Sequence, residues 1–256
     1  MNRVPSPPAF LNKLLLWIGV LLTGAVLGGC ATQIPVASTA PAGPDAPIAL
    51  VMTEARQQAI SAEQALQILK DGNARFVAGA MLARDLPAQV RASGRDGQFP
   101  LASIVSCIDS RADPALVFDQ GIGDLFVARV AGNVVNPDVL GSLEYGSAVA
   151  GTKLIVILGH THCGAIKGAC DGVVLGNLTQ LVARLQPAVA ATSSRPGAER
   201  NSKNAQFVDA VAATNVELTV RELLDKSPVL QQLVQQGRLQ VVGAMLDVET
   251  GVVKFD

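Results

Sequence analysis

Two short apolar runs constrain the fold of this chain more than any other feature. They cover residues 101–105 and 154–158, and each passes directly into polar residues that can carry chemistry. Apolar runs of four to eight residues that end in polar or glycine residues are typical of buried parallel strands. Open α/β sheets bind their ligands at the carboxyl ends of such strands, so we expect the functional site where these two runs end.

The residues that follow the two runs include a set of zinc ligands. Cys107 follows the first run, and His160 and Cys163 follow the second. Thiolate and imidazole are groups that zinc prefers, and a catalytic zinc keeps three protein ligands and one open position. A cysteine or histidine taken singly would more often be a packing residue. Both histidines of the chain lie in the second segment, however, and this concentration favours a metal site with one zinc ion per chain.

Asp109 and Arg111 follow Cys107 at alternate positions and are the candidate catalytic residues. Alternate residues leaving a strand can point to the same side, so Asp109 can reach the fourth position of the metal or a water molecule there. Arg111 can hold the Asp109 carboxylate through two parallel hydrogen bonds. The alternative is an ordinary ion pair that only orients the loop. We expect His162, which lies between the two metal ligands of its segment, to point away from the metal.

These segments resemble the signature of the β-class carbonic anhydrases. The residues that carry the resemblance are C-I-D-S-R at 107–111 and G-H-T-H-C-G at 159–164. The resemblance covers roughly residues 55–256, and such a spread argues against a chance match to a short motif. Further matching segments are G-N-A-R-F at 72–76, residues 123–133, G-S-L-E-Y at 141–145, S-P-V-L at 227–230 and V-V-G-A-M at 241–245.

The resemblance implies an activity and an assembly. It implies zinc-dependent, reversible hydration of CO2 to bicarbonate and a proton by zinc-bound hydroxide, in a homodimer or a higher homo-oligomer. It also implies that Asp109 accepts a hydrogen bond from the hydroxide and becomes the fourth zinc ligand in a closed state. Tyr145 matches a tyrosine that lines the active site of related enzymes, although a packing role fits it equally well.

Other functions stay open at this point. Residues around the pocket rather than the metal ligands decide the substrate, so the chain could hydrolyse a related heterocumulene such as carbonyl sulfide. A non-catalytic zinc-binding lipoprotein of the cell envelope is the second alternative, and the Asp109–Arg111 pair argues against it. A cysteine-nucleophile enzyme fits less well, because no phosphate-cradling loop surrounds Cys107.

Residues 1–29 have the features of a secretory signal. Arg3 and Lys13 precede an apolar run over residues 14–26, and small residues follow, as in segments that are cut after export. The run is short for a membrane-spanning helix, which needs about 20 apolar residues. L-G-G-C at 27–30 resembles the bacterial lipobox, which implies that Cys30 is lipidated and becomes the new N-terminus. An uncleaved anchor and a cleaved soluble form are the alternatives.

We therefore expect an exported, lipid-anchored membrane protein of the cell envelope that faces the periplasm. Residues 30–53 are rich in Ala, Pro and Thr without any periodicity, and we interpret them as a flexible tether. Basic and acidic side chains number 20 and 21 and form no basic cluster, so nothing favours nucleic acid as a partner.

The remaining residues, 54–256, are predicted to form the catalytic domain. Strands are expected at 101–106, 125–130, 154–158 and 239–245, and helices alternate with them. This order predicts an α/β fold with a central, mostly parallel β-sheet flanked by helices, as the resemblance also implies. The helices are expected at 54–78 with a Ser61–Gln64 capping box, from Pro114 onward, at 138–149, at 172–186, at 204–225 and after Pro228.

The resemblance also bears on regulation. Some bacterial members of the family hold an inhibitory bicarbonate between a tryptophan, an arginine and a tyrosine. Arg129 matches that arginine, but the only tryptophan of this chain is Trp17, inside the segment that we expect to be removed. We therefore predict no bicarbonate inhibition through such a pocket.

Overall fold

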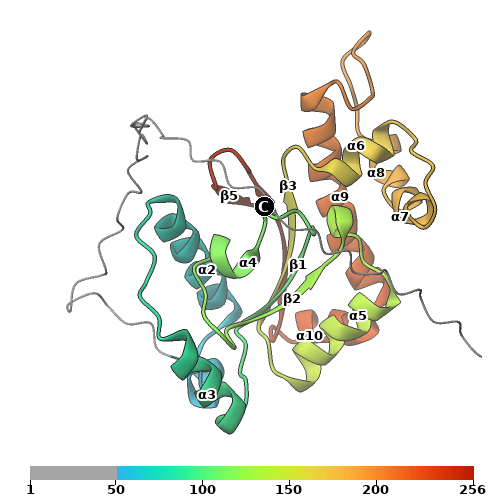
Figure 1. Ribbon diagram of the computed structural model, residues 1–256. Helices are drawn as coiled ribbons and strands as arrows, with labels where there is room; N and C mark the ends of the chain where they lie inside the picture. The colour runs from blue at the N-terminus through green and yellow to red at the C-terminus, as the bar shows by residue number, and fades with distance from the viewer. Residues whose placement is uncertain (1–50) are drawn as a thin grey trace, which may run out of the picture. The chain divides into compact units, whose positions relative to one another are not determined.

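The structure is a computed structural model that describes residues 51–256, and a twisted five-stranded sheet runs through its centre (Figure 1). The strand order is β2-β1-β3-β4-β5. The first four strands are parallel, and β5 is antiparallel to β4. The prediction of a mostly parallel sheet is confirmed. The strands are β1 (Ala102–Ser106), β2 (Leu125–Arg129), β3 (Leu154–His160), β4 (Gln240–Leu246) and β5 (Val253–Phe255).

Helices cover both faces of the sheet, as Figure 1 shows. None of the helices within residues 51–256 combines the length and the apolar character that a membrane crossing requires. The helices are α1 (Glu54–Ala59), α2 (Ala62–Val77), α3 (Leu86–Asp96), α4 (Pro114–Val117), α5 (Pro137–Glu144), α6 (Gly164–Cys170), α7 (Leu178–Ala183), α8 (Gln186–Ala191), α9 (Ala205–Lys226) and α10 (Pro228–Gln235).

The helix expected at 54–78 is divided into α1 and α2. The division falls where the predicted capping box lies. The Gln64 N–H donates to Ser61 Oγ at 3.1 Å, and the Ser61 N–H donates to Gln64 Oε1 at 2.8 Å. These bonds satisfy backbone donors that a helix start leaves without partners, so α2 begins at this point.

The prediction of a single helix over residues 172–186 is wrong. Instead α6 ends at Cys170, and the chain is non-helical until α7 begins at Leu178. Gly172 and Gly176 have φ angles of 64° and 43°. These angles lie in the left-handed region, which glycine enters without a steric penalty and which a right-handed helix cannot contain. The apolar residues between the two glycines give a helix-like periodicity, but the backbone there turns.

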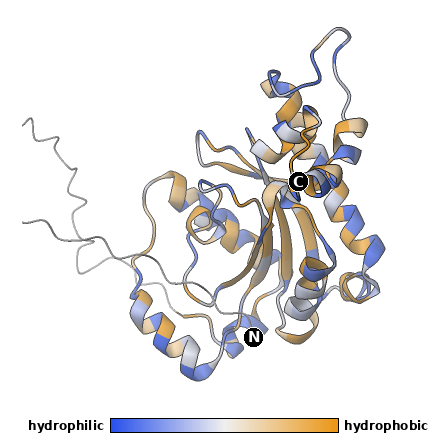
Figure 2. Cartoon of the chain, turned by 45° about the vertical axis from the view of Figure 1, so that its right-hand side comes forward, coloured by the Kyte–Doolittle hydropathy of each residue, from blue (hydrophilic) through white to orange (hydrophobic). Residues whose placement is uncertain are grey.

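The core lies on the two faces of the strands, which are the most uniformly apolar elements in Figure 2. On one face α2 packs on the sheet, with Leu69 and Ile104 fully buried. On the other face α5, α9 and α10 pack on it, around the buried Ile157 and Val216. Both faces of β3 are therefore buried, which explains why its sequence is an uninterrupted apolar run.

Helix α9 lies unusually close to β3 and β4. A Cβ atom added at Gly159 would be 2.6 Å from Cγ2 of Val216, and one added at Gly243 would be 2.7 Å from Cγ1 of the same valine. Only glycine fits at both positions without a shift of the neighbouring atoms. This contact fixes α9 beside the carboxyl end of β3, where the candidate site lies.

Candidate metal centre

Three predicted ligands meet at the carboxyl ends of β1 and β3. Cys107 follows β1 directly, His160 is the last residue of β3, and Cys163 is the N-cap of α6. The two strands are adjacent and parallel, and Ser106 pairs with Leu158, so both ends reach the same edge of the sheet. The two Sγ atoms and an imidazole nitrogen all lie within 4.8 Å of one another, and all three residues are buried.

The imidazole of His160 has the arrangement of a metal ligand. Its Nδ1 lies 2.8 Å from the carbonyl oxygen of Thr161. A carbonyl can only accept, so Nδ1 carries the proton and Nε2 keeps its lone pair. Nε2 is buried and has no hydrogen-bond partner among residues 51–256. A buried polar atom without a partner is rare and calls for an explanation. A zinc ion supplies it, since zinc prefers two thiolates and one imidazole and such a histidine is oriented through its other nitrogen.

Cys107 is the more acidic of the two thiols. The adjacent Cys163 thiol lowers the pKa of Cys107 to about 4, and the His160 ring and the Gly132 N–H add to this effect although burial opposes it. The same pairing, together with burial, raises the pKa of Cys163. Metal binding requires both sulfurs as thiolates, so it must release the proton from Cys163.

Gly132 forms part of the wall around Cys107. Its backbone N–H donates to Cys107 Sγ at 3.3 Å. Gly132 has a φ of 70°, and a Cβ atom there would lie 3.0 Å from a methyl group of Leu185. A glycine is therefore required for two reasons, the left-handed backbone and the close contact.

Asp109 and Arg111 form the ion pair expected from their spacing. The Nε of Arg111 donates to Oδ1 of Asp109 at 3.0 Å, and Nη2 donates to Oδ2 at 2.8 Å. The hydrogen bonds from Arg111 hold the pKa of Asp109 well below its usual range, so the carboxylate is ionised at physiological pH. Oδ2 of Asp109 lies 4.0 Å from Nε2 of His160. The charged carboxylate therefore lies beside Nε2 of His160, the nitrogen whose lone pair is available to a metal ion.

Arg129, at the end of β2, holds the loop that carries Cys107 and Asp109. Its Nε donates to the Cys107 carbonyl at 2.9 Å, and its Nη2 donates to the Asp109 carbonyl. Its Nη1 lies 3.3 Å from Oδ2 of Asp113. Every nitrogen of this guanidinium group thus has a partner in the same loop.

His162 lies outside the ligand cluster. Its backbone N–H donates to Oδ1 of Asp209 at 2.7 Å. The ring nitrogen Nε2 lies 3.4 Å from Oε1 of Glu249. Its φ of 57° is left-handed, which is uncommon for a residue with a side chain. The strained backbone turns the chain between His160 and Cys163.

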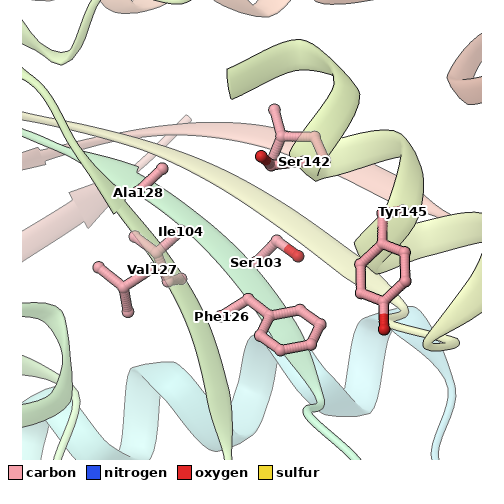
Figure 3. Close-up of a pocket in the computed structure, with 8 residues that line it drawn as sticks. Ser103, Ile104, Phe126, Val127, Ala128, Ser142 and Tyr145 are labelled. Atoms are coloured by element: carbon pink, nitrogen blue, oxygen red, sulfur yellow. The ribbon is translucent and has the colours of Figure 1, made fainter. Parts of the chain in front are cut away.

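Tyr145 lines a different pocket from the one that holds the metal ligands. It begins the π-helical turn Tyr145–Val149, is 54% exposed, and its ring centroid is 6.2 Å from that of Phe126 (Figure 3). The pocket beside these rings has a volume of about 230 Å³, and its lining includes none of the three cluster residues. Within one subunit, Tyr145 is not grouped with the metal site.

Sequence reasoning missed Asp209 and Asn215, two polar residues of α9 that contact the backbone of the site. Neither residue stands out in the sequence, because polar residues are common on helices and the burial of Asn215 appears only in the folded chain. The predicted lipidation site Cys30, the signal segment 1–29 and Trp17 lie outside the described residues.

Comparisons with known proteins agree with this site. A family model described as carbonic anhydrase matches residues 102–253, which include all five predicted metal-binding and catalytic residues. Carbonic anhydrase 2 of Mycobacterium tuberculosis is 38% identical over 192 residues, covering 73% of this chain and 89% of that protein. A carbonic anhydrase of Mycolicibacterium smegmatis is 37% identical over 196 residues, covering 75% of this chain and 91% of that protein.

Solved structures give the same result. One of the tetrameric β-carbonic anhydrases of Sordaria macrospora superimposes with a TM-score of 0.55 at 26% identity, covering 66% of this chain and 90% of that one. A β-carbonic anhydrase of Aspergillus fumigatus gives a TM-score of 0.58 at 25% identity, covering 76% of this chain and 89% of that one.

Proposed function

The chain belongs to the β-class carbonic anhydrases, and we propose that its Asp109–Arg111 pair orients the reacting water beside a zinc ion held by Cys107, His160 and Cys163. The reaction is the reversible hydration of CO2 to bicarbonate and a proton. The observation that carries the assignment of roles is the buried Nε2 of His160, which has no hydrogen-bond partner within residues 51–256, belongs to the cluster with the two sulfurs, and lies 4.0 Å from Oδ2 of Asp109.

The zinc ion supplies a Lewis acid that lowers the pKa of a water molecule, so that CO2 can be attacked near neutral pH. Two thiolates and a neutral imidazole leave the site without net charge, which makes this effect weaker than at a site of three histidines. Asp109 compensates by accepting a hydrogen bond from the reacting water. Its carboxylate has about four lone-pair positions, and the side chain of Arg111 occupies only one on each oxygen.

Arg111 keeps Asp109 in one orientation and in its charged form. A carboxylate that is ionised and held by two parallel bonds accepts a hydrogen bond without first having to reorganise. This property matters for a reaction whose acceptor must be in place before CO2 arrives. Arg129 supports the pair indirectly. It donates hydrogen bonds to the carbonyl groups of Cys107 and Asp109, in the loop that carries the pair.

Stopped-flow CO2 hydration with purified, zinc-analysed protein tests this function. The expected result is a hydration rate that scales with zinc content and that falls when Asp109 is replaced by Asn. Carbonyl sulfide in the same assay tests the alternative hydrolysis. A zinc-loaded protein that is inactive toward both substrates would support the non-catalytic zinc-binding lipoprotein instead.

We also propose that the enzyme works in the cell envelope, attached through a lipid on Cys30. The support comes from the sequence, in which a basic start and an apolar run precede L-G-G-C at 27–30. A tether over residues 30–53 would let the catalytic domain reach substrate near the membrane surface while it faces the periplasm.

We propose a homo-oligomer in which the edge strand β2 faces a second subunit. β2 is the outermost strand of the sheet on its side, so one row of its backbone groups has no partner strand in the part of the chain that the structure describes. Val127, Tyr145 and Val149 expose 42%, 54% and 72% of their surface beside this edge. At such an interface Tyr145 lines the active site of the partner subunit rather than its own. Light scattering of Val127→Asp tests the arrangement, with dissociation as the expected result.

A further inference from the structure

Helix α9 contacts the segment that carries His160 and Cys163, and it also contacts the Gly132 turn that bonds to Cys107. A polar side chain makes each contact. We infer that α9 is the element that positions the metal ligands, with Asp209 and Asn215 as its positioning residues. Asp209 accepts from the segment that contains His160 and Cys163, and Asn215 donates to the turn beside Cys107. The inference rests on the metal site and not on the reaction carried out there.

The Asn215 contact acts on Cys107 through Gly132. The Nδ2 of Asn215 donates to the Gly132 carbonyl at 3.0 Å, and the Gly132 N–H donates to Cys107 Sγ at 3.3 Å. Asn215 is 5% exposed, so its amide does not exchange this partner freely for water. The two bonds fix both peptide groups that flank Gly132. An N–H donor held at one distance from a thiolate fixes the position of the sulfur and stabilises its charge.

The Asp209 contact acts on the other two ligands through His162. Oδ1 of Asp209 accepts the His162 N–H at 2.7 Å, the short distance expected when the acceptor is charged. His162 has left-handed backbone, which persists only where the surroundings impose it. Asp209 stabilises this conformation, and the turn it creates brings His160 and Cys163 to face the same point.

The packing of α9 makes these two contacts rigid. Val216, next to Asn215, is fully buried and fits against Gly159 and Gly243, where no larger residue has room. The helix cannot slide along or lift from β3 without losing this fit. Asp209 and Asn215 therefore contact the His160–Cys163 segment and the Gly132 turn from a fixed support, which is the condition for precise metal geometry.

The test measures zinc affinity by chelator competition at fixed pH, with Asp209→Ala and Asn215→Leu as the variants. Asp209→Ala removes the hydrogen bond to the His160–Cys163 segment, and Asn215→Leu removes the one to the Gly132 turn. Leu has the same branching and the same number of side-chain heavy atoms as Asn. We expect a zinc Kd about 10- to 100-fold weaker for each, the range found when groups behind metal ligands are removed. The visible absorption of the cobalt-substituted protein, which reports ligand geometry, should shift in both variants.

Two matched controls lie on the same helix. Thr219→Val alters a buried polar residue one turn beyond Asn215, and Glu217→Ala removes an exposed acid. Neither side chain bonds to the His160–Cys163 segment or to Gly132, so both variants should bind zinc like the parent protein. Asp209→Asn keeps an acceptor oxygen and should restore most of the zinc affinity and the parent cobalt spectrum. Far-UV circular dichroism establishes that each variant folds.

The inference is overturned if Asp209→Ala and Asn215→Leu bind zinc within threefold of the parent and leave the cobalt spectrum unchanged. It is equally overturned if Thr219→Val weakens zinc binding as much as Asn215→Leu, because the effect would then come from packing alone. Asp209 is only partly buried, so its variants still test the inference if Asn215→Leu does not fold. Asp209→Ala should then bind zinc more weakly than Asp209→Asn.

Discussion

Arg111 holds both carboxylate oxygens of Asp109, with 3.0 Å from Nε to Oδ1 and 2.8 Å from Nη2 to Oδ2. The Arg111 backbone N–H adds a third bond to Oδ1 at 2.9 Å. The carboxylate is thereby kept ionised and aimed at the metal cluster without being a member of it. The proposed separation between holding the metal and orienting the water leads to the first two predictions.

Replacing Asp109 with Asn is expected to leave zinc bound and to slow turnover. The variant loses the charged acceptor and the paired bonds from Arg111, and a hydrogen bond to a charged group contributes roughly 1.5–3 kcal/mol. That range corresponds to a decrease on the order of 10- to 100-fold in kcat/KM. Zinc analysis and stopped-flow hydration at neutral pH measure the two quantities. Asp96→Asn is the control, since Asp96 forms an exposed ion pair with Arg95 on α3. Parent-like turnover in Asp109→Asn would mean that the pair only orients the loop.

Removing a ligand is expected to remove the metal. Cys107→Ser and His160→Ala should each lose most of the zinc and the activity, because a structural or catalytic zinc needs its full set of protein ligands. Cys170→Ser is the matched control, since Cys170 is a free cysteine outside the cluster. Metal analysis after gel filtration gives the zinc content per chain. Full zinc occupancy in both ligand variants would disprove the assignment.

The close contact between α9 and β3 predicts a stability effect at Gly159. In Gly159→Ala the new methyl group would lie 2.6 Å from Val216 and 2.7 Å from Met245. Overpacking of this kind typically costs about 1–3 kcal/mol in the free energy of unfolding. Gly164→Ala is the control, because a Cβ atom there meets nothing within 4 Å and Ala favours the helix. Urea unfolding of the two variants should differ clearly in midpoint, and equal midpoints would contradict the predicted contact.

Most of the sheet could be predicted from the sequence, because each buried strand is a short apolar run. β3 is the clearest example, since it is buried on both faces along its whole length. The region after the metal ligands could not be predicted in the same way. Apolar residues around Val174 repeat with a helical period, yet Gly172 and Gly176 take left-handed φ angles that end the helical geometry. Periodicity does not report φ angles, and so α6 was missed and residues 172–177 were predicted to be helical.

The metal ligands could be predicted because chemistry restricts the residue types and the strand ends place them together. The supporting residues could not. Asp209 lies 47 residues from His162 in the sequence, and Asn215 lies 83 residues from Gly132. Their roles arise only when α9 packs on β3 at Gly159. Polar residues on a helix are common, and the sequence gives no reason to single out these two before the packing is known.

Attachment through Cys30 predicts a change of compartment on mutation. Cys30→Ser should release the protein from the membrane fraction, because each buried CH2 of an acyl chain contributes about 0.8 kcal/mol to membrane binding. Cys170→Ser, which changes a cysteine of the catalytic domain, should stay with the membranes. Fractionation followed by immunoblotting makes the comparison. Unchanged membrane association of Cys30→Ser would favour an uncleaved apolar helix.

The last prediction is that bicarbonate does not inhibit this enzyme through a pocket built on Arg129. The guanidinium group already bonds to the carbonyl groups of Cys107 and Asp109 and to the carboxylate of Asp113. Three of its five N–H donors are thus engaged in the loop, so an anion would find at most two of them free. Trp17, the only tryptophan, lies in the segment that we propose is removed. A buried anion that lacks one of its donors costs about 1–3 kcal/mol, which weakens binding roughly 5- to 150-fold. Initial hydration rates at increasing bicarbonate, with pH and ionic strength fixed, should therefore show only simple product inhibition. Steep, cooperative inhibition would mean that other residues have rebuilt the pocket.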